Sequence, residues 1–273
     1  MMESWNVGIM KRAKLGQNFL VNRHVAEKMV KKFLPVNGPI LEIGPGKGIL
    51  TQLLITHCRN NRIITIELDK SLFSQLKEKY IENEGFEILN QDILKTDFHQ
   101  FFPNEDETVN IIGNVPYYIS KELLDWVIHH RQKIKKGMFM MQKEFVDKLT
   151  SGTGSKLYNA QSVLFNGVFR VEKMFDVQPG SFSPPPRVKS TVFLFERVSS
   201  VFDAEINTAD FYRFLRRCFR NRRKTLFNNL ASIYDTGKLS GIFSSLHLDS
   251  KVRAEQLILE NFLGIYRLLC NKK

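Results

Sequence analysis

Leu41-Glu42-Ile43-Gly44-Pro45-Gly46-Lys47-Gly48 is the stretch of sequence that decides the fold. It runs from a short β-rich segment through a glycine turn into a segment of helical periodicity. This succession is typical of a strand-turn-helix unit whose backbone approaches a ligand closely. The glycines are spaced G-x-G-x-G, so the dinucleotide fingerprint G-x-G-x-x-G does not match and a dehydrogenase is disfavoured. An ordinary strand-to-helix turn remains the alternative for this segment taken alone.

The same alternation of short apolar runs and helical segments continues downstream of this turn. Strands are predicted over residues 40–43, 63–66, 86–89, 109–112 and 138–141, and helices over 49–58, 71–80, 121–130 and 143–149. This order predicts a parallel sheet with crossover helices. Residues 163–169, 173–177 and 188–195 are expected to be further strands without a long helix among them, forming an antiparallel edge of the sheet.

Composition limits the class of protein and its partners. The 273 residues predict one large domain over 1–200 and a small helical one over 201–273. The last 76 residues of the chain, 198–273, hold 13 basic and 7 acidic side chains. A net charge of +12 makes a polyanion the first partner to consider, with an anionic membrane surface as the competing one. No apolar run reaches the roughly 18 residues of a spanning helix, and residues 1–14 lack the apolar stretch of a secretory signal. We therefore expect a soluble intracellular protein.

The three cysteines, Cys58, Cys218 and Cys270, lie far apart in the sequence. Their spacing matches neither a zinc site nor a disulfide framework, so we expect reduced side chains and no metal.

Acidic residues follow the second and third predicted strands. Glu67 lies 19 residues beyond Gly48, where a carboxylate can accept hydrogen bonds from both ribose hydroxyls of an adenosine. Asp92 lies at the same edge of the sheet, where it could recognise an adenine amino group. Each acid alone is more often a solvated strand end or a helix cap. Together with the glycine turn, they favour binding of an adenosyl group.

The fourth predicted strand runs directly into Asn114-Val115-Pro116-Tyr117. The amine of adenine is a poor nucleophile because its lone pair is delocalised into the ring. The Asn114 amide oxygen and the backbone carbonyl of Val115 or Pro116 could accept its two N–H groups and favour in-line attack on a sulfonium methyl. Tyr117 offers a face for stacking a flipped-out base. An Asn-initiated β-turn is the alternative for this tetrapeptide alone.

Two more aromatic residues fit this pocket, Phe19 and Phe182. Phe182 lies in the proline-rich segment 179–186, which is predicted to be a stiff, non-helical surface loop that exposes the ring. The ring could clamp the target base, or it could pack under the loop.

Residues 211–225 contain seven basic side chains and no acid: Arg213, Arg216, Arg217, Arg220, Arg222, Arg223 and Lys224. Clustered guanidinium groups at helical spacing suit phosphate binding and recognition of A-form RNA. A charged surface helix docked on the core is the alternative.

In this order, the motifs resemble the ribosomal RNA adenine N6,N6-dimethyltransferase family, most of all its bacterial small-subunit branch. The resemblance covers roughly residues 11–257, and the matching pieces are Leu15-Gly-Gln-Asn-Phe-Leu20, Glu42-Ile-Gly-Pro-Gly46, Ile66-Glu-Leu-Asp69, Asn114-Val-Pro-Tyr117, Gln142-Lys-Glu144, Phe182-Ser-Pro-Pro-Pro-Arg-Val188 and Arg222-Arg-Lys-Thr-Leu226. The chain departs from the family pattern at Val115, where Leu is frequent, at Tyr118, where Asn is frequent, and at Asn159, where Gly is usual.

The resemblance implies a Rossmann-like class I methyltransferase fold, with a mostly parallel seven-stranded sheet, helices on both faces and a small C-terminal helical domain. It implies S-adenosyl-L-methionine as methyl donor and S-adenosyl-L-homocysteine as product. The implied reaction is dimethylation of the N6 amines of two adjacent adenosines in the hairpin loop near the 3′ end of 16S rRNA. The implied setting is the 30S small ribosomal subunit in the cytoplasm, with the enzyme acting as a monomer in subunit biogenesis.

The resemblance also assigns roles to residues. The implied catalytic residues are Asn114, Pro116, Tyr117 and Phe182. The implied cofactor-binding residues are Gln17, Asn18, Leu20, Gly44, Gly46, Glu67 on the ribose, Leu68, Asp92 on the adenine, Ile93 and Asn114. The implied RNA-binding residues are Arg216, Arg217, Arg220, Arg222, Arg223 and Lys224.

Three rival functions stay open at this point. The macrolide-resistance branch of the superfamily methylates one adenine of large-subunit rRNA, and the triple proline at 184–186 with the basic tail favours the small-subunit branch. A ribosome-assembly or transcription factor that has lost catalysis is disfavoured by the intact Asn114-Val-Pro-Tyr117. A DNA adenine methyltransferase would generally carry Asp in place of Asn114.

Overall fold

The computed structural model describes residues 17–104, 106–198 and 206–270. Leu15 and Gly16 of the first motif, and the polar segment 1–14, lie outside the described residues. Two compact units share the described chain: one within Met1–Val146 and Val171–Arg197, the other within Asp147–Arg170 and Val198–Lys273. The division into a catalytic domain over 1–200 and a helical RNA-binding domain over 201–273 stays a prediction.

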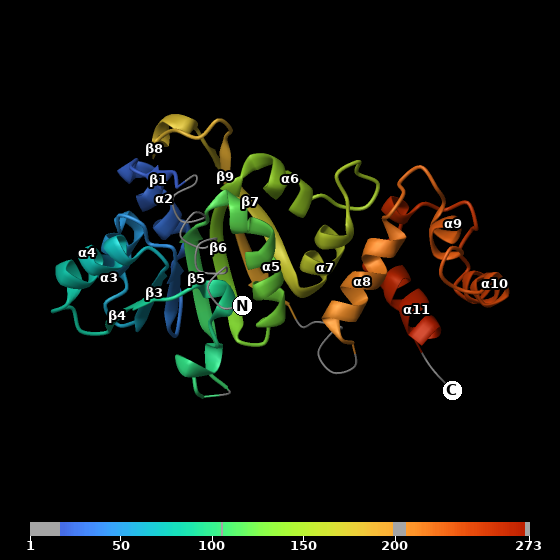
Figure 1. Cartoon of the computed structure of the whole chain (residues 1–273), viewed down its shortest axis with the longest axis horizontal. Helices are drawn as coiled ribbons and strands as arrows, with labels where there is room; N and C mark the ends of the chain where they lie inside the picture. The colour runs from blue at the N-terminus through green and yellow to red at the C-terminus, as the bar shows by residue number, and fades with distance from the viewer. Residues whose placement is uncertain (1–16, 105, 199–205, 271–273) are drawn as a thin grey trace, which may run out of the picture. The chain divides into compact units, whose positions relative to one another are not determined.

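The first unit is built on a seven-stranded sheet of order β4-β3-β2-β5-β6-β9-β7 within the described residues (Figure 1). The strands are β2 (Ile40–Ile43), β3 (Ile63–Glu67), β4 (Phe86–Asn90), β5 (Val109–Asn114), β6 (Ile134–Gln142), β7 (Phe169–Val177) and β9 (Ser190–Arg197). Strands β2 to β6 pair in parallel and β9 pairs antiparallel to β6, which confirms the predicted parallel sheet with an antiparallel addition. The strand order reverses between β2 and β5, where α/β sheets place their ligand crevice.

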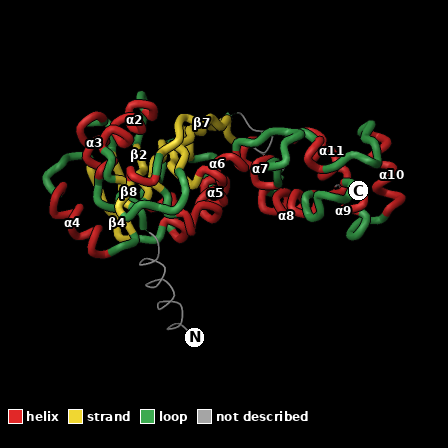
Figure 2. The backbone as a smooth tube through the Cα atoms, turned by 90° about the horizontal axis from the view of Figure 1, so that it is seen from above, coloured by secondary structure: helices red, strands yellow, loops and turns green. Residues whose placement is uncertain are grey.

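Helices cover both faces of this sheet (Figures 1 and 2). Helix α2 (Arg23–Phe33) buries Ala26, Met29, Val30 and Phe33, an i, i+3, i+4, i+7 stripe that packs with α3 (Ile49–His57) in one core cluster. Helix α5 (Ser120–His129) lies on the opposite face. The other helices of this part are α4 (Lys70–Tyr80) and α6 (Lys143–Leu149), with 3₁₀ turns η1 (Ile93–Lys95), η2 (Phe98–Gln100) and η3 (Tyr117–Ile119). Every residue of β2 and β3 is buried, as expected of strands covered on both faces.

The strand predicted over residues 163–169 is wrong. Helix α7 (Ala160–Val168) occupies this segment, and β7 begins only at Phe169. Asn159 starts the helix with a capping box, because its side chain accepts from the backbone of Ser162 and the Ser162 hydroxyl accepts from the Asn159 N–H. The apolar run Val163–Phe165 is buried, and a short buried run of this kind does not distinguish a helix from a strand by periodicity.

The proline-rich segment also differs from its prediction. It contains one turn of 3₁₀ helix, η4 (Pro179–Ser181), followed by β8 (Phe182–Ser183), which pairs antiparallel with β1 (Phe19–Leu20). Proline is compatible with the first position of such a turn because that position donates no internal hydrogen bond. Phe182 is only 4% exposed and belongs to the core cluster, so the expectation of an exposed ring is wrong.

The second unit is helical in its described residues. Besides α7 it contains α8 (Thr208–Cys218), α9 (Leu226–Leu230), α10 (Thr236–Ser245), η5 (Ala254–Gln256) and α11 (Leu259–Cys270). Helix α8 buries Phe211, Phe214, Leu215 and Cys218 on one face. The helical periodicity expected over 211–225 therefore ends at Cys218, and a loop carries the remaining basic residues. Across the described chain, no helix has the length and apolar character needed to cross a bilayer.

A substitution at Gly113 tests how closely β2 and β5 must approach each other. A Cβ added there would lie 2.6 Å from the backbone oxygen of Ile43, which cannot move without disturbing the strand pair. We expect Gly113→Ala to lower the free energy of unfolding by about 1–3 kcal/mol in urea denaturation. Gly152→Ala is the control, because nothing lies within 4 Å of its added Cβ. Equal stability of the two variants would show that the strands tolerate the methyl group.

Candidate active site

The glycine turn links the end of β2 to the start of α3 in a left-handed backbone. Gly44, Gly46 and Gly48 have φ values of +64°, +58° and +80°, which side chains other than glycine rarely adopt. A Cβ on Gly48 would also lie 2.5 Å from the Leu76 side chain. The turn therefore requires glycine for conformation at all three positions and for space at Gly48, and Gly44 and Gly46 line the cavity.

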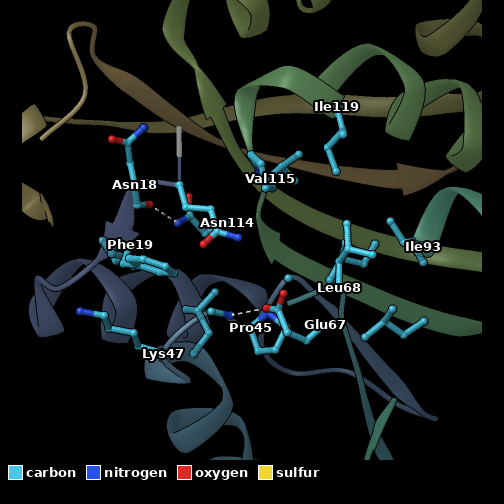
Figure 3. Close-up of a pocket in the computed structure, with 18 of the residues that line it drawn as sticks. Asn18, Phe19, Pro45, Lys47, Glu67, Leu68, Ile93, Asn114, Val115 and Ile119 are labelled. Carbon is cyan, nitrogen blue, oxygen red and sulfur yellow. Dashed lines mark hydrogen bonds between the residues drawn. The ribbon is translucent and has the colours of Figure 1, made fainter. Parts of the chain in front are cut away.

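Glu67, at the end of β3, is 4% exposed and is held by two backbone donors. The Gly46 N–H donates to Oε2 at 3.0 Å (Figure 3). The Asp69 N–H donates to Oε1 at 2.8 Å. Burial raises the pKa of Glu67, and these N–H groups oppose the rise by stabilising the charged form. The carboxylate is thus oriented by backbone, with its remaining lone pairs available for further donors.

Glu42, in the middle of β2, is buried beneath the glycine turn. Its Oε2 accepts from the Thr51 hydroxyl at 2.7 Å, while its Oε1 has no hydrogen-bond partner among the described residues. Burial raises the pKa of Glu42 to about 8, with a smaller contribution from the nearby Glu67 charge. Below that pH the side chain is a neutral acid.

Asp92 combines the two roles that the sequence left open. Its Oδ1 caps η1 by accepting from the Leu94 N–H at 3.1 Å, and the residue also lines the cavity. No described residue donates to its Oδ2. The cap therefore fixes the carboxylate and leaves one oxygen for a ligand.

The Asn114 side chain is oriented by the chain that precedes β1. Its Nδ2 donates to the backbone carbonyl of Asn18 at 3.2 Å (Figure 3). A carbonyl only accepts, so this bond turns the amide oxygen the other way. Within the described chain, Oδ1 accepts no hydrogen bond. Two residues on, the Pro116 carbonyl already accepts from the Ile119 N–H at 3.1 Å.

One cavity brings together the residues at the ends of β2, β3, β4 and β5. Every implied cofactor-binding residue, from Gln17 to Asn114, lies on it, and so do Pro116, Tyr117 and Phe182. The cavity also has lining residues to which the sequence assigned no role, among them Lys47 and Ile119 (Figure 3), as well as Tyr118. Phe19 covers the glycine turn, 3.0 Å from a Cβ placed on Gly46, and the Lys47 ammonium lies 5.2 Å from its ring centre.

The implied RNA-binding residues belong to the second unit. Most of them are exposed, on α8 or the loop after it: Arg216, Arg217, Arg220, Arg223 and Lys224. Arg222 differs, because it is partly buried and donates to the backbone carbonyls of Tyr158 at 2.8 Å and Ser155 at 3.4 Å. Its guanidinium thus ties the loop after α8 to the segment before α7, a contact that residue type and spacing did not reveal.

The strand order, the antiparallel strand β9 and a cavity at the carboxyl ends of the parallel strands define a class I methyltransferase, an enzyme that depends on S-adenosylmethionine. The chain belongs to the ribosomal RNA adenine dimethylase family, whose profile matches residues 8–271. It is therefore an enzyme that methylates adenine in ribosomal RNA, as its sequence motifs predicted.

Individual relatives agree with this assignment. A ribosomal RNA small subunit methyltransferase A from Acidobacterium capsulatum is 37% identical over 94% of this chain and 91% of its own length. One from Malacoplasma penetrans is 36% identical over 92% of this chain and 89% of its own. The crystal structure of a dimethyladenosine transferase from Plasmodium falciparum is 26% identical, with a TM-score of 0.76 over 90% of this chain and 95% of that one.

Glu42→Gln tests the buried neutral acid. Because the pKa of Glu42 rises from 4.5 to about 8 on folding, its contribution to stability is complete below pH 4.5 and is lost as pH rises through about 8. Glutamine has a similar shape and does not ionise. We expect the variant to gain stability relative to the wild type between pH 5 and pH 9, on the order of a few kcal/mol.

Chemical denaturation at several pH values measures this gain. Glu82→Gln, which removes an exposed carboxyl, is the control and leaves the pH profile of stability unchanged. A constant difference between Glu42→Gln and the wild type across this range would mean that Glu42 is ionised in the folded protein.

Proposed function

We propose that this enzyme dimethylates the N6 amines of two adjacent adenosines in the hairpin loop near the 3′ end of 16S rRNA, within the 30S subunit. The observation that carries the proposal is the oriented Asn114 amide, whose oxygen faces away from Asn18 and is available to an amine. The names of the relatives from Acidobacterium and Malacoplasma support the small subunit as the substrate. We further propose that the enzyme acts in the cytoplasm as a monomer, and that its action on the small subunit is part of subunit biogenesis.

The cavity fits S-adenosyl-L-methionine as the methyl donor. The Glu67 carboxylate, held by two backbone N–H groups, is suited to accept both ribose hydroxyls. The Asp92 Oδ2 is suited to accept from the adenine amino group, between the apolar side chains of Leu68 and Ile93. The donor supplies a methyl group on a sulfonium and leaves as S-adenosyl-L-homocysteine.

The chain's own contribution to the reaction is to orient the target amine. Asn114 Oδ1 accepts one N–H, and the Val115 carbonyl is the better second acceptor because the Pro116 carbonyl is already bonded to the Ile119 N–H. These bonds localise the nitrogen lone pair and aim it at the methyl group. Tyr117 holds the base by stacking, and Phe182 lines the same cavity.

The second methyl transfer places a further demand on this site. A monomethylated amine has one N–H for two acceptors, so one acceptor loses its bond and the nitrogen must rotate. Because Asn114 is fixed through Nδ2 and not through Oδ1, losing the bond at Oδ1 leaves the side chain in position.

The exposed basic residues of the second unit are proposed to bind the phosphates of the subunit RNA. Arg216 and Arg217 on α8, and Arg220, Arg223 and Lys224 after it, present their charges to solvent. Phosphate contacts of this kind give affinity that falls with salt. The carbonyl contacts of Arg222 give that residue a structural role beside any contact with RNA.

Methyl transfer to purified subunits tests the proposed reaction. We expect labelled methyl groups to enter small subunits that lack the modification, and Asn114→Ala to reduce the rate by about 100-fold or more because one fixed acceptor is removed. Asn61→Ala is the control, since its amide donates to the carbonyls of Val36 and Gly38 away from the cavity. Equal labelling of large subunits would contradict the small-subunit assignment, and full activity of Asn114→Ala would contradict the mechanism.

Salt-dependent binding tests the basic surface. Changing Arg216, Arg220 and Arg223 together to Gln should weaken binding to small subunits about tenfold or more. It should also lower the slope of log K against log[salt] by about one for each phosphate that is no longer bound. Arg222→Gln should instead lower the unfolding temperature, because two backbone carbonyls lose their donor. If the triple variant binds with an unchanged salt slope, these arginines do not contact RNA phosphates, and α8 is only a charged helix on the protein surface.

A further inference from the structure

We propose that Ser190 is a positioning residue for methyl transfer, holding the ring of Tyr117 in the plane on which the target base stacks. This inference rests on the proposed function, in which Tyr117 receives the base. Nothing in the motif Asn114-Val-Pro-Tyr117 points to Ser190, which lies 73 residues further along the chain.

The two hydroxyl groups are joined by a short hydrogen bond. Tyr117 Oη and Ser190 Oγ are 2.7 Å apart, and either one can donate. Ser190 is fully buried, and the described lining of the cavity includes Tyr117 but not Ser190. Ser190 therefore cannot touch a bound base and can affect it only through Tyr117.

Ser190 is a firm anchor because it begins β9. It pairs with Gln142 of β6 in the sheet register, and the backbone carbonyl before it, that of Lys189, accepts from the Lys143 N–H at 2.9 Å. The next residue, Thr191, donates its hydroxyl to Asp176 of β7 at 2.7 Å. The strand end that carries Ser190 is thus fixed by contacts with the strands on both sides of β9.

Tyr117 has no comparable support of its own. It begins η3, a single turn of 3₁₀ helix, and its side chain is only partly buried. The phenol hydroxyl lies at the far end of the ring, where a hydrogen bond restricts rotation about both side-chain torsions. A ring held in this way is ordered before the base binds. The entropy of ordering the ring is therefore already lost in the free enzyme and does not add to the barrier for methyl transfer.

A double-mutant cycle separates this role from a merely structural one. Ser190→Ala should slow single-turnover methyl transfer about 5- to 10-fold, because the partly buried Tyr117 hydroxyl loses its partner, with little change in the KM for the methyl donor. In a Tyr117→Phe background, which has no phenol hydroxyl to hold, the same change should have no further effect. Thr65→Val is the matched control, because it removes a buried hydroxyl from β3 that donates to the Glu87 carbonyl, makes no contact with Ser190 or Tyr117, and should act equally in both backgrounds.

The outcomes distinguish this inference from the proposed function. If Ser190→Ala slows the Tyr117→Phe enzyme as much as the wild type, or slows neither, Ser190 is structural and the inference fails. If Tyr117→Ala keeps the wild-type rate, the proposed stacking role of Tyr117 fails whatever Ser190 does. Ser190→Cys, of nearly the same size but a weak hydrogen-bonding group, keeps the test open if Ser190→Ala does not fold, and should show the same dependence on the Tyr117 hydroxyl.

Discussion

The left-handed backbone of Gly44, Gly46 and Gly48 brings the end of β2 close enough to β3 for the Gly46 N–H to reach the Glu67 carboxylate at 3.0 Å. The rest of the site depends on this turn. It opens the cavity at the point where the strand order reverses, and it supplies one of the two donors that orient the buried acid. Side chains at these positions would strain the turn or, at Gly48, collide with Leu76.

A common feature of the polar groups in the cavity is that backbone atoms hold them. Two N–H groups orient Glu67, the Leu94 N–H orients Asp92, and the Asn18 carbonyl orients Asn114. Each side chain keeps at least one oxygen free of these contacts. Because the backbone is itself fixed by the sheet, these acceptors are in place before a ligand arrives, which is the condition for electrostatic preorganisation.

Distant segments complete the site around these strand ends. Strand β1, which follows Asn18, pairs with β8 more than 160 residues later. This pairing holds Asn18, whose carbonyl orients Asn114, close to Phe182, which lines the cavity. The end of β9 reaches the same region through the hydrogen bond between Ser190 and Tyr117. The cavity therefore depends on pairing between both ends of the first unit, as well as on the central strands.

Sequence alone was enough to identify the parallel sheet, the glycine turn, the acids at Glu67 and Asp92 and the Asn114-Val-Pro-Tyr117 motif, because each is a local pattern with a local physical cause. Tertiary structure decided what depends on distant neighbours. It made residues 160–168 a buried helix, buried the Phe182 ring, bonded Arg222 to backbone carbonyls and placed Ser190 against Tyr117. Burial and hydrogen-bond partners are properties of pairs of segments, and periodicity along one segment contains no information about the other.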